Sequence, residues 1–108
     1  MKVREIAEKA ELKILSMPDP EREVIGAYMG DLLSWVMGRA GESNVWITIM
    51  SNINVVAVAS LADVSCVILS EGVELEEDVL NAAKEKGINI LSTNLPSYET
   101  AIALSGMV

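Results

Sequence analysis

The feature that most constrains the fold is a pattern that occurs three times. A short aliphatic run is followed by small polar residues and then by a helix-like segment. The three runs end in Ile49-Met50-Ser51-Asn52, Ile68-Leu69-Ser70-Glu71-Gly72 and Ile90-Leu91-Ser92-Thr93-Asn94. Short runs rich in Val and Ile are typical of buried strands. Strands that alternate with helices predict an α/β fold, because parallel neighbouring strands must be joined by a crossover.

The alternation extends over most of the chain. Helical spacing of apolar residues predicts helices at 3–10, 32–37, 75–86 and 98–104, and aliphatic runs predict strands at 24–29, 45–50, 64–69 and 88–91. Gly38 and Gly41 are expected to end the helix at 32–37. Residues 12–15 form a short apolar stretch, after which Pro18 and Pro20 exclude a helix.

Residues 53–61 (INVVAVASL) fit two structures. Their β-branched residues favour a strand, which would form a hairpin with the strand at 45–50. The strand–helix alternation favours a buried helix instead, because parallel strands need a crossover. We choose the helix.

A chain of 108 residues with 51% hydrophobic residues predicts one domain with one packed core. The chain has no Phe, two Trp and two Tyr, so the core must be mainly aliphatic. The expected fold class is therefore α/β, a single domain with a mainly parallel sheet flanked by helices. We divide it into an N-terminal helix and strand extension, residues 1–23, and a core α/β unit, residues 24–108.

The charge distribution excludes several partners. The net charge is −8 and the eight basic residues are scattered, which argues against nucleic acid. The acidic run at 74–78 is read as the solvated first turn of a helix. Residues 45–69 are long enough to cross a bilayer, but six polar residues interrupt them, so no membrane association is expected. Cys66, the single cysteine, is expected to be a buried, inert thiol of a cytoplasmic protein.

No motif for catalysis or metal binding is present. The chain has no His and neither of the two glycine-rich phosphate-binding motifs, and we assign no catalytic residue and no metal site. The polar residues after the three strands should meet at the carboxyl edge of the sheet, where open α/β sheets bind ligands. The candidate ligand-binding residues are Ser51, Asn54, Ser70, Gly72, Ser92, Thr93 and Asp31.

Structural roles compete with this binding hypothesis. Ser, Thr and Asn after a strand also serve as helix caps and turn residues, and that interpretation needs no ligand. Asp31 precedes the helix at 32–37, so it is either the N-cap of that helix or an edge group of the same crevice; we favour the cap. The residues identify no cofactor.

The order of several stretches resembles the DRTGG domain family. The resemblance covers about three-quarters of the chain, from Gly30 onward, and its most specific part is the Gly-Ile-x-Ile-Leu-Ser-Thr run. The matching stretches are GDLLS at 30–34, VWITIM at 45–50, NVVAVASL at 54–61, ILSEG at 68–72 and GINILSTNLPSY at 87–98.

The resemblance implies an α/β fold, a homodimer and an accessory role without catalysis. Such domains resemble the N-terminal domain of HPr kinase/phosphorylase and occur beside CBS domains in regulatory pyrophosphatases. This chain departs from the family pattern, since Ser70-Glu71-Gly72 replaces Thr-Gly-Gly and Ser51-Asn52 stands where Asp-Arg would. A phosphate site that relies on that arginine would lack it here.

Three functions follow from these observations. The first is a homodimeric regulatory or ligand-sensing module whose ligand is a small molecule, nucleotides included. The second is an adaptor that binds a larger enzyme through exposed Trp35, Met37 or Tyr98; a redox enzyme is suggested because the stand-alone type resembles proteins encoded near iron hydrogenases. The third is a small enzyme that pairs Ser or Thr with a carboxylate. We favour the first.

Overall fold

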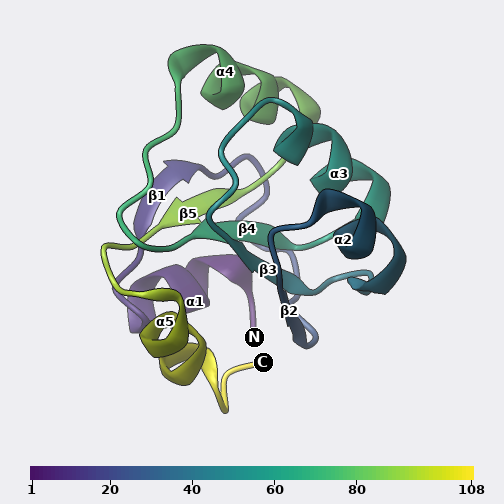
Figure 1. Ribbon diagram of the computed structural model, residues 1–108. Coiled ribbons are helices and arrows are strands. Elements are labelled where there is room, and N and C mark those ends of the chain that lie inside the picture. The colour runs from purple at the N-terminus through teal and green to yellow at the C-terminus, as the bar shows by residue number, and fades with distance from the viewer.

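Five strands form one sheet in the computed structural model, which describes residues 1–108 (Figure 1). The sheet order is β1-β5-β4-β3-β2. β2, β3, β4 and β5 run parallel, and β1 joins the β5 edge in the antiparallel sense. The mainly parallel sheet predicted from the sequence is confirmed. The strands are β1 (Lys13–Ser16), β2 (Ala27–Met29), β3 (Val45–Thr48), β4 (Cys66–Leu69) and β5 (Ile90–Ser92).

Helices cover both faces of this sheet (Figure 1). α2, α3 and α4 connect the parallel strands and pack on one face, whereas α1 and α5 pack on the other. The crossover predicted at 53–61 is confirmed as a helix. No helix is long and apolar enough to cross a membrane. The helices are α1 (Val3–Lys9), α2 (Leu33–Arg39), α3 (Asn54–Ala62), α4 (Glu77–Lys86) and α5 (Ser97–Leu104).

Alternation along the strands divides the core into two clusters. In β4, Val67 and Leu69 pack toward α2, α3 and α4, while Cys66 and Ile68 pack toward α1 and α5. Successive side chains of a strand point to opposite faces, which explains why all four are buried. Trp46 is fully buried as well, so it adds nothing to the exposed apolar surface.

The expected boundaries differ from the structure by about one to three residues, and two of these differences have a clear cause. The strand predicted at 24–29 is shortened to β2, because the backbone N–H groups of Val24 and Ile25 donate to Met1 and Ser43 rather than to a neighbouring strand. Helix α2 continues through Gly38 to Arg39, since an exposed glycine inside a helix costs only about 1 kcal/mol relative to Ala. Neither difference alters the topology.

Candidate functional site

The chain leaves the sheet in opposite directions after β4 and β5. After β4 it forms α4 on one face, and after the adjacent β5 it forms α5 on the other (Figure 1). In an open α/β sheet, a crevice opens at the carboxyl ends of neighbouring strands whose connections diverge in this way. The sites that follow β2 and β3 lack this divergence, because α2 and α3 lie on the same face as α4.

A cleft of about 640 Å³ lies beside this divergence point. Its apolar lining residues, called the aliphatic wall below, are Ala10, Leu15, Val73, Leu75, Leu80 and Leu95. The polar side chains around it are Glu11, Lys13, Glu74, Ser92, Thr93 and Asn94. These residues come from the α1–β1 turn, β1, the end of β5, the loops after β4 and β5, and α4. The volume is within the range of small-molecule sites.

Backbone hydrogen bonds fix the two loops against each other. The Gly72 N–H donates to the Thr93 carbonyl over 3.0 Å, and the Glu71 N–H donates to the Leu95 carbonyl over 2.8 Å. Gly72 has a φ of +71°, and a Cβ there would lie 3.2 Å from Asn94 Oδ1. The positive φ therefore favours glycine at this position, and a Cβ there would press on the Asn94 side chain.

Carboxylates occupy both helix N-termini near the cleft. Glu71 Oε2 accepts a hydrogen bond of 2.7 Å from the Ser97 N–H in the first turn of α5. The first turn of α4 carries Glu77 and Asp78, directly after Glu76 at its N-cap. The partial positive charge of each helix start is thus already matched by the protein's own acids.

Comparison with known proteins identifies the family of this fold. The model of the DRTGG domain matches residues 5–107. This chain belongs to the DRTGG domain family. The match begins at residue 5 rather than at Gly30, so it includes α1 and β1 as well. No protein with a curated description matches the sequence significantly.

A solved DRTGG domain shares the architecture. It is part of the CBS and DRTGG domains of the regulatory region of Clostridium perfringens pyrophosphatase, complexed with its activator diadenosine tetraphosphate. The TM-score is 0.69 at 16% identity, over 92% of this chain and 44% of that chain. At this identity the likeness shows the fold alone, and this chain corresponds to less than half of that regulatory region.

The DRTGG domain brings together three of the predicted binding residues. Gly72, Ser92 and Thr93 line the cleft. Ser70 is buried beside it, and its hydroxyl shares a 2.6 Å hydrogen bond with that of Ser97. Ser51 lines a separate hollow of about 310 Å³, whose other residues include Glu74, Glu76 and Asp78. Asn54 is exposed at the start of α3, where its N–H is bonded to Asn52.

Asp31 is not the N-cap of α2. The N-cap is Leu32, and α2 has no side-chain cap. Asp31 Oδ1 instead accepts hydrogen bonds from Thr48 Oγ1 over 2.8 Å and from the Ile49 N–H over 3.0 Å. These bonds satisfy the donors at the carboxyl end of β3, which the sheet leaves without a partner. Asp31 therefore lies on the predicted edge of the sheet but outside the cleft.

The wall of the cleft that β1 provides is not predicted from the sequence. Lys13 lies opposite Ser92 in the antiparallel ladder, which places both side chains on the same face, and Leu15 follows on that face two residues later. The alternation of Lys13 and Leu15 is visible in the sequence. Nothing in the sequence shows that this short run pairs with β5, which lies far along the chain.

The Cys66 thiol takes no part in the cleft. It packs on the opposite face of the sheet, among the residues that contact α1 and α5, and it is fully buried. Burial disfavours the thiolate and raises the pKa of the Cys66 thiol to about 12. The expectation of a buried thiol is confirmed.

Proposed function

We propose that this chain is a non-catalytic regulatory domain that senses a small ligand and acts as a homodimer in the cytoplasm. The observation that carries the proposal is the cleft at the divergence of α4 and α5, lined by Gly72, Ser92 and Thr93. Membership of the DRTGG domain family supports a regulatory role. The C. perfringens relative supports ligand sensing, since its regulatory region was solved with an activator bound.

The hydroxyl groups favour binding over catalysis. A catalytic Ser or Thr needs a base within hydrogen-bond reach and must also be open to substrate. Thr48 contacts the Asp31 carboxylate, but Thr48 is only 1% exposed. Thr93 lines the cleft, and its Oγ1 accepts a hydrogen bond from the Leu95 N–H rather than contacting a carboxylate. The partly exposed hydroxyls of Ser92 and Thr93 are therefore suited to hydrogen bonding with a ligand.

The charges of the cleft disfavour a polyphosphate. Diadenosine tetraphosphate is the activator in the relative, yet here Glu11 and Glu74 line the cleft and Lys13 is its single basic residue. Carboxylates repel phosphate groups, and each helix start nearby already faces an acidic side chain. The proposed ligand is a small molecule that carries little net negative charge.

Native mass spectrometry of protein purified without denaturation tests the ligand site. We expect a bound small molecule in the wild type and a reduced bound fraction in the Ser92→Ala, Thr93→Ala double variant. Ser34 and Ser60 are exposed on α2 and α3, outside the cleft, so Ser34→Ala, Ser60→Ala is the matched control. Equal occupancy in both double variants would refute binding in this cleft.

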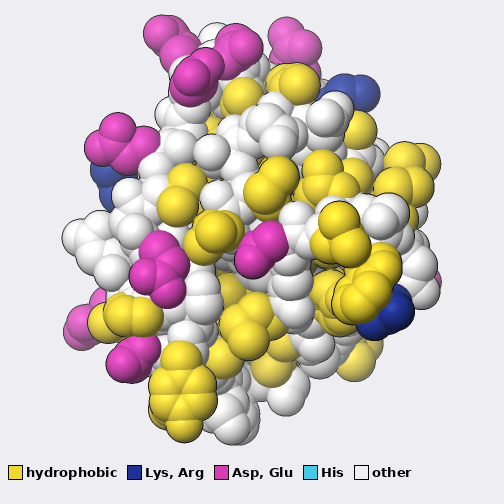
Figure 2. Space-filling model, in the orientation of Figure 1, with side chains coloured by type: hydrophobic (Ala, Val, Ile, Leu, Met, Phe, Trp, Pro, Cys, Tyr) yellow, Lys and Arg dark blue, Asp and Glu magenta, His cyan; other side chains and the backbone are white.

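The homodimer is proposed to form through the surface around α2. Trp35 and Met37 are 51% and 50% exposed, and Met29 on the adjoining β2 is 52% exposed. The Arg39 guanidinium lies 3.8 Å from the centroid of the Trp35 ring. Figure 2 shows hydrophobic side chains gathered over α2 and α3, whereas acidic ones gather over α4. Contiguous exposed apolar patches of this kind mark association surfaces.

Sedimentation equilibrium tests this assembly. We expect a dimer in the wild type and a monomer in Trp35→Asp, Met37→Asp, with the Tyr98→Asp variant on α5 as control. A wild type that sediments as a monomer would refute the homodimer. The same exposed surface would then favour the adaptor function, in which α2 binds a larger enzyme.

A further inference from the structure

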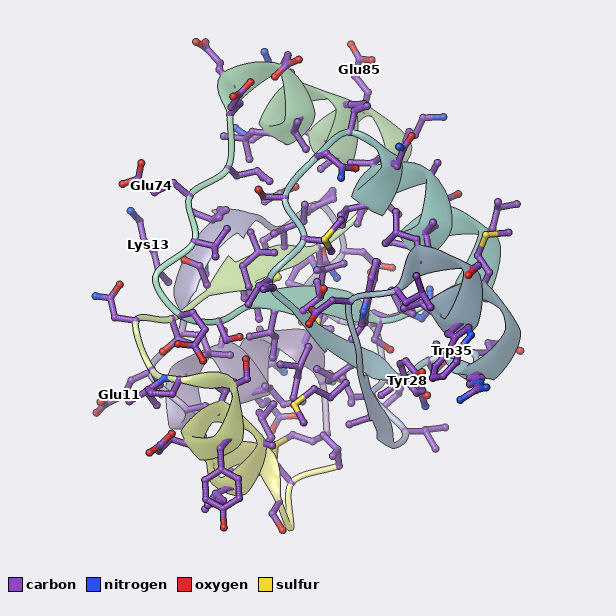
Figure 3. All side chains as sticks on the ribbon, in the orientation of Figure 1. Glu11, Lys13, Tyr28, Trp35, Glu74 and Glu85 are labelled. Carbon is purple, nitrogen blue, oxygen red and sulfur yellow. The ribbon has the colours of Figure 1, made fainter.

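The cleft holds charges of both signs that do not pair with each other. Glu11, Lys13 and Glu74 all line it, and none of them belongs to the four ion pairs of the protein. Figure 3 shows all three on the same side of the molecule, on the α1–β1 turn, on β1 and on the loop before α4. An ammonium and two carboxylates are thus presented around one hollow, and no ion pair within 4.0 Å joins them.

The wall beside these charges is aliphatic. Leu15 and Leu75 line the cleft and also pack against the core on the α4 side of the sheet. Leu80, Val73 and Leu95 line the cleft beside them. No aromatic side chain lines the cleft, so a flat base or ring has no stacking partner there. The surface fits a branched aliphatic group, which gains about 0.8 kcal/mol for each CH₂ that it buries.

The polar wall can hold the backbone-like part of such a ligand. Ser92, which pairs with Lys13 across the strands, and Asn94 line the same cleft with a hydroxyl and a side-chain amide, and both groups can donate to carboxylates. Glu11 and Glu74 accept hydrogen bonds from an ammonium and attract its charge. A ligand that carries one charge of each sign would therefore satisfy groups that a singly charged ligand leaves unmatched.

We propose that the cleft binds an aliphatic α-amino acid of the leucine type. Its carboxylate contacts Lys13, its ammonium group contacts Glu11 or Glu74, which lie on either side of Lys13 (Figure 3), and its side chain lies on the Leu15 and Leu75 wall. This inference rests on the proposed ligand-sensing function and names its ligand class. It is consistent with the exclusion of polyphosphates, because a zwitterion adds no net charge to a cleft that is itself acidic.

Isothermal titration with three ligands of matched shape tests the zwitterion. Leucine carries both charges, isocaproate lacks the ammonium and isoamylamine lacks the carboxylate. We expect the wild type to bind leucine about fivefold tighter than either analogue, because each analogue forfeits one exposed charge pair and its hydrogen bonds. Lys13→Gln should abolish the preference for leucine over isoamylamine and keep the preference over isocaproate.

The complementary variant reverses this pattern. Glu11→Gln, Glu74→Gln should abolish the preference for leucine over isocaproate and keep the preference over isoamylamine. Lys84→Gln and Glu85→Gln, both exposed on α4 outside the cleft, are matched charge controls and should change neither preference. Circular dichroism of each variant confirms that it is folded before titration.

Specific outcomes would overturn the inference. If the wild type binds a singly charged analogue as tightly as leucine, the cleft does not recognise both charges and the inference is wrong. The same holds if Lys13→Gln leaves both preferences unchanged. If that analogue then fails to bind to the Ser92→Ala, Thr93→Ala double variant, the cleft is still a ligand site and the proposed function stands. Failure of leucine to bind at millimolar concentration also overturns the inference, whereas the native mass spectrum tests the proposed function independently.

Discussion

Replacing Glu11 by glycine should stabilise the fold. Glu11 follows the C-cap of α1 and has a φ of +54°, in the left-handed region. The Leu12 N–H donates to the Ala7 carbonyl over 2.8 Å and the Glu11 N–H to the Glu8 carbonyl over 3.2 Å, which is the Schellman arrangement. Glycine is the usual residue at this position, because it has no Cβ to clash with the backbone.

The expected gain follows from three terms. A side chain in the left-handed region costs about 1–2 kcal/mol, and glycine removes that cost. Loss of a carboxylate from the negative end of α1 adds about 0.3 kcal/mol for an exposed group. The greater freedom of glycine in the unfolded chain subtracts about 0.4–1 kcal/mol. The net gain is about 1 kcal/mol, or roughly 4 °C in Tm for a domain of this size.

Urea denaturation and calorimetry of Glu11→Gly and Glu11→Ala separate the causes. The alanine variant loses the carboxylate but keeps a Cβ in the left-handed region, so it should gain only a few tenths of a kcal/mol. If the two variants are equally stable, the assignment of strain to residue 11 is wrong.

Three further predictions concern groups outside the cleft. The Cys66 thiol should react with thiol reagents only on global unfolding. Because the pKa of this thiol is raised in the folded state, the free energy of unfolding should fall between pH 9.0 and about 12. The Cys66→Ala variant should not show this pH-dependent fall. Hydrogen bonds from Lys2 and Arg4 lower the pKa of the Glu21 carboxyl group. The Glu21→Gln variant should therefore be less stable than the wild type above pH 4.5, and this difference should vanish as the pH falls through the lowered pKa. Acid titration followed by circular dichroism measures this difference. In urea denaturation, Asp31→Ala should lower the free energy of unfolding by about 1–3 kcal/mol, because the Thr48 hydroxyl and the Ile49 N–H lose their acceptor. Asp31→Asn should lower it less, because the amide oxygen can still accept both hydrogen bonds.

The alternation of strands and helices could be predicted because it obeys a topological constraint. Residues 53–61 show the principle most clearly, since Val55, Val56 and Val58 favour a strand by propensity alone. They form α3 because β3 and β4 are parallel neighbours that need a crossover, and because burial of the three valines outweighs their modest helix penalty.

The candidate site could be predicted only in part, because its walls are set by contacts distant in the sequence. Gly72, Ser92 and Thr93 follow strands, and the carboxyl edge of a parallel sheet brings such residues together. Lys13 and Leu15 join them through the antiparallel pairing of β1 with β5, which no local pattern specifies. Asp is a residue type that is common at helix N-caps, but the Asp31 carboxylate instead accepts hydrogen bonds from donors at the end of β3 that have no partner in the sheet.

The pairing of β1 with β5 also determines when the cleft can exist during folding. The strands β2 to β5 are joined in sequence order by short crossovers, so they can assemble progressively as neighbours. The Lys13–Ser92 pair closes a loop that spans most of the chain, and such non-local contacts form late because their closure entropy is large. We expect the edge strand to be the last part of the sheet to form and the first to detach in local opening. A ligand held between Lys13 and the loop after β5 would then tie the beginning of the chain to its end, so hydrogen exchange in β1 should slow on binding.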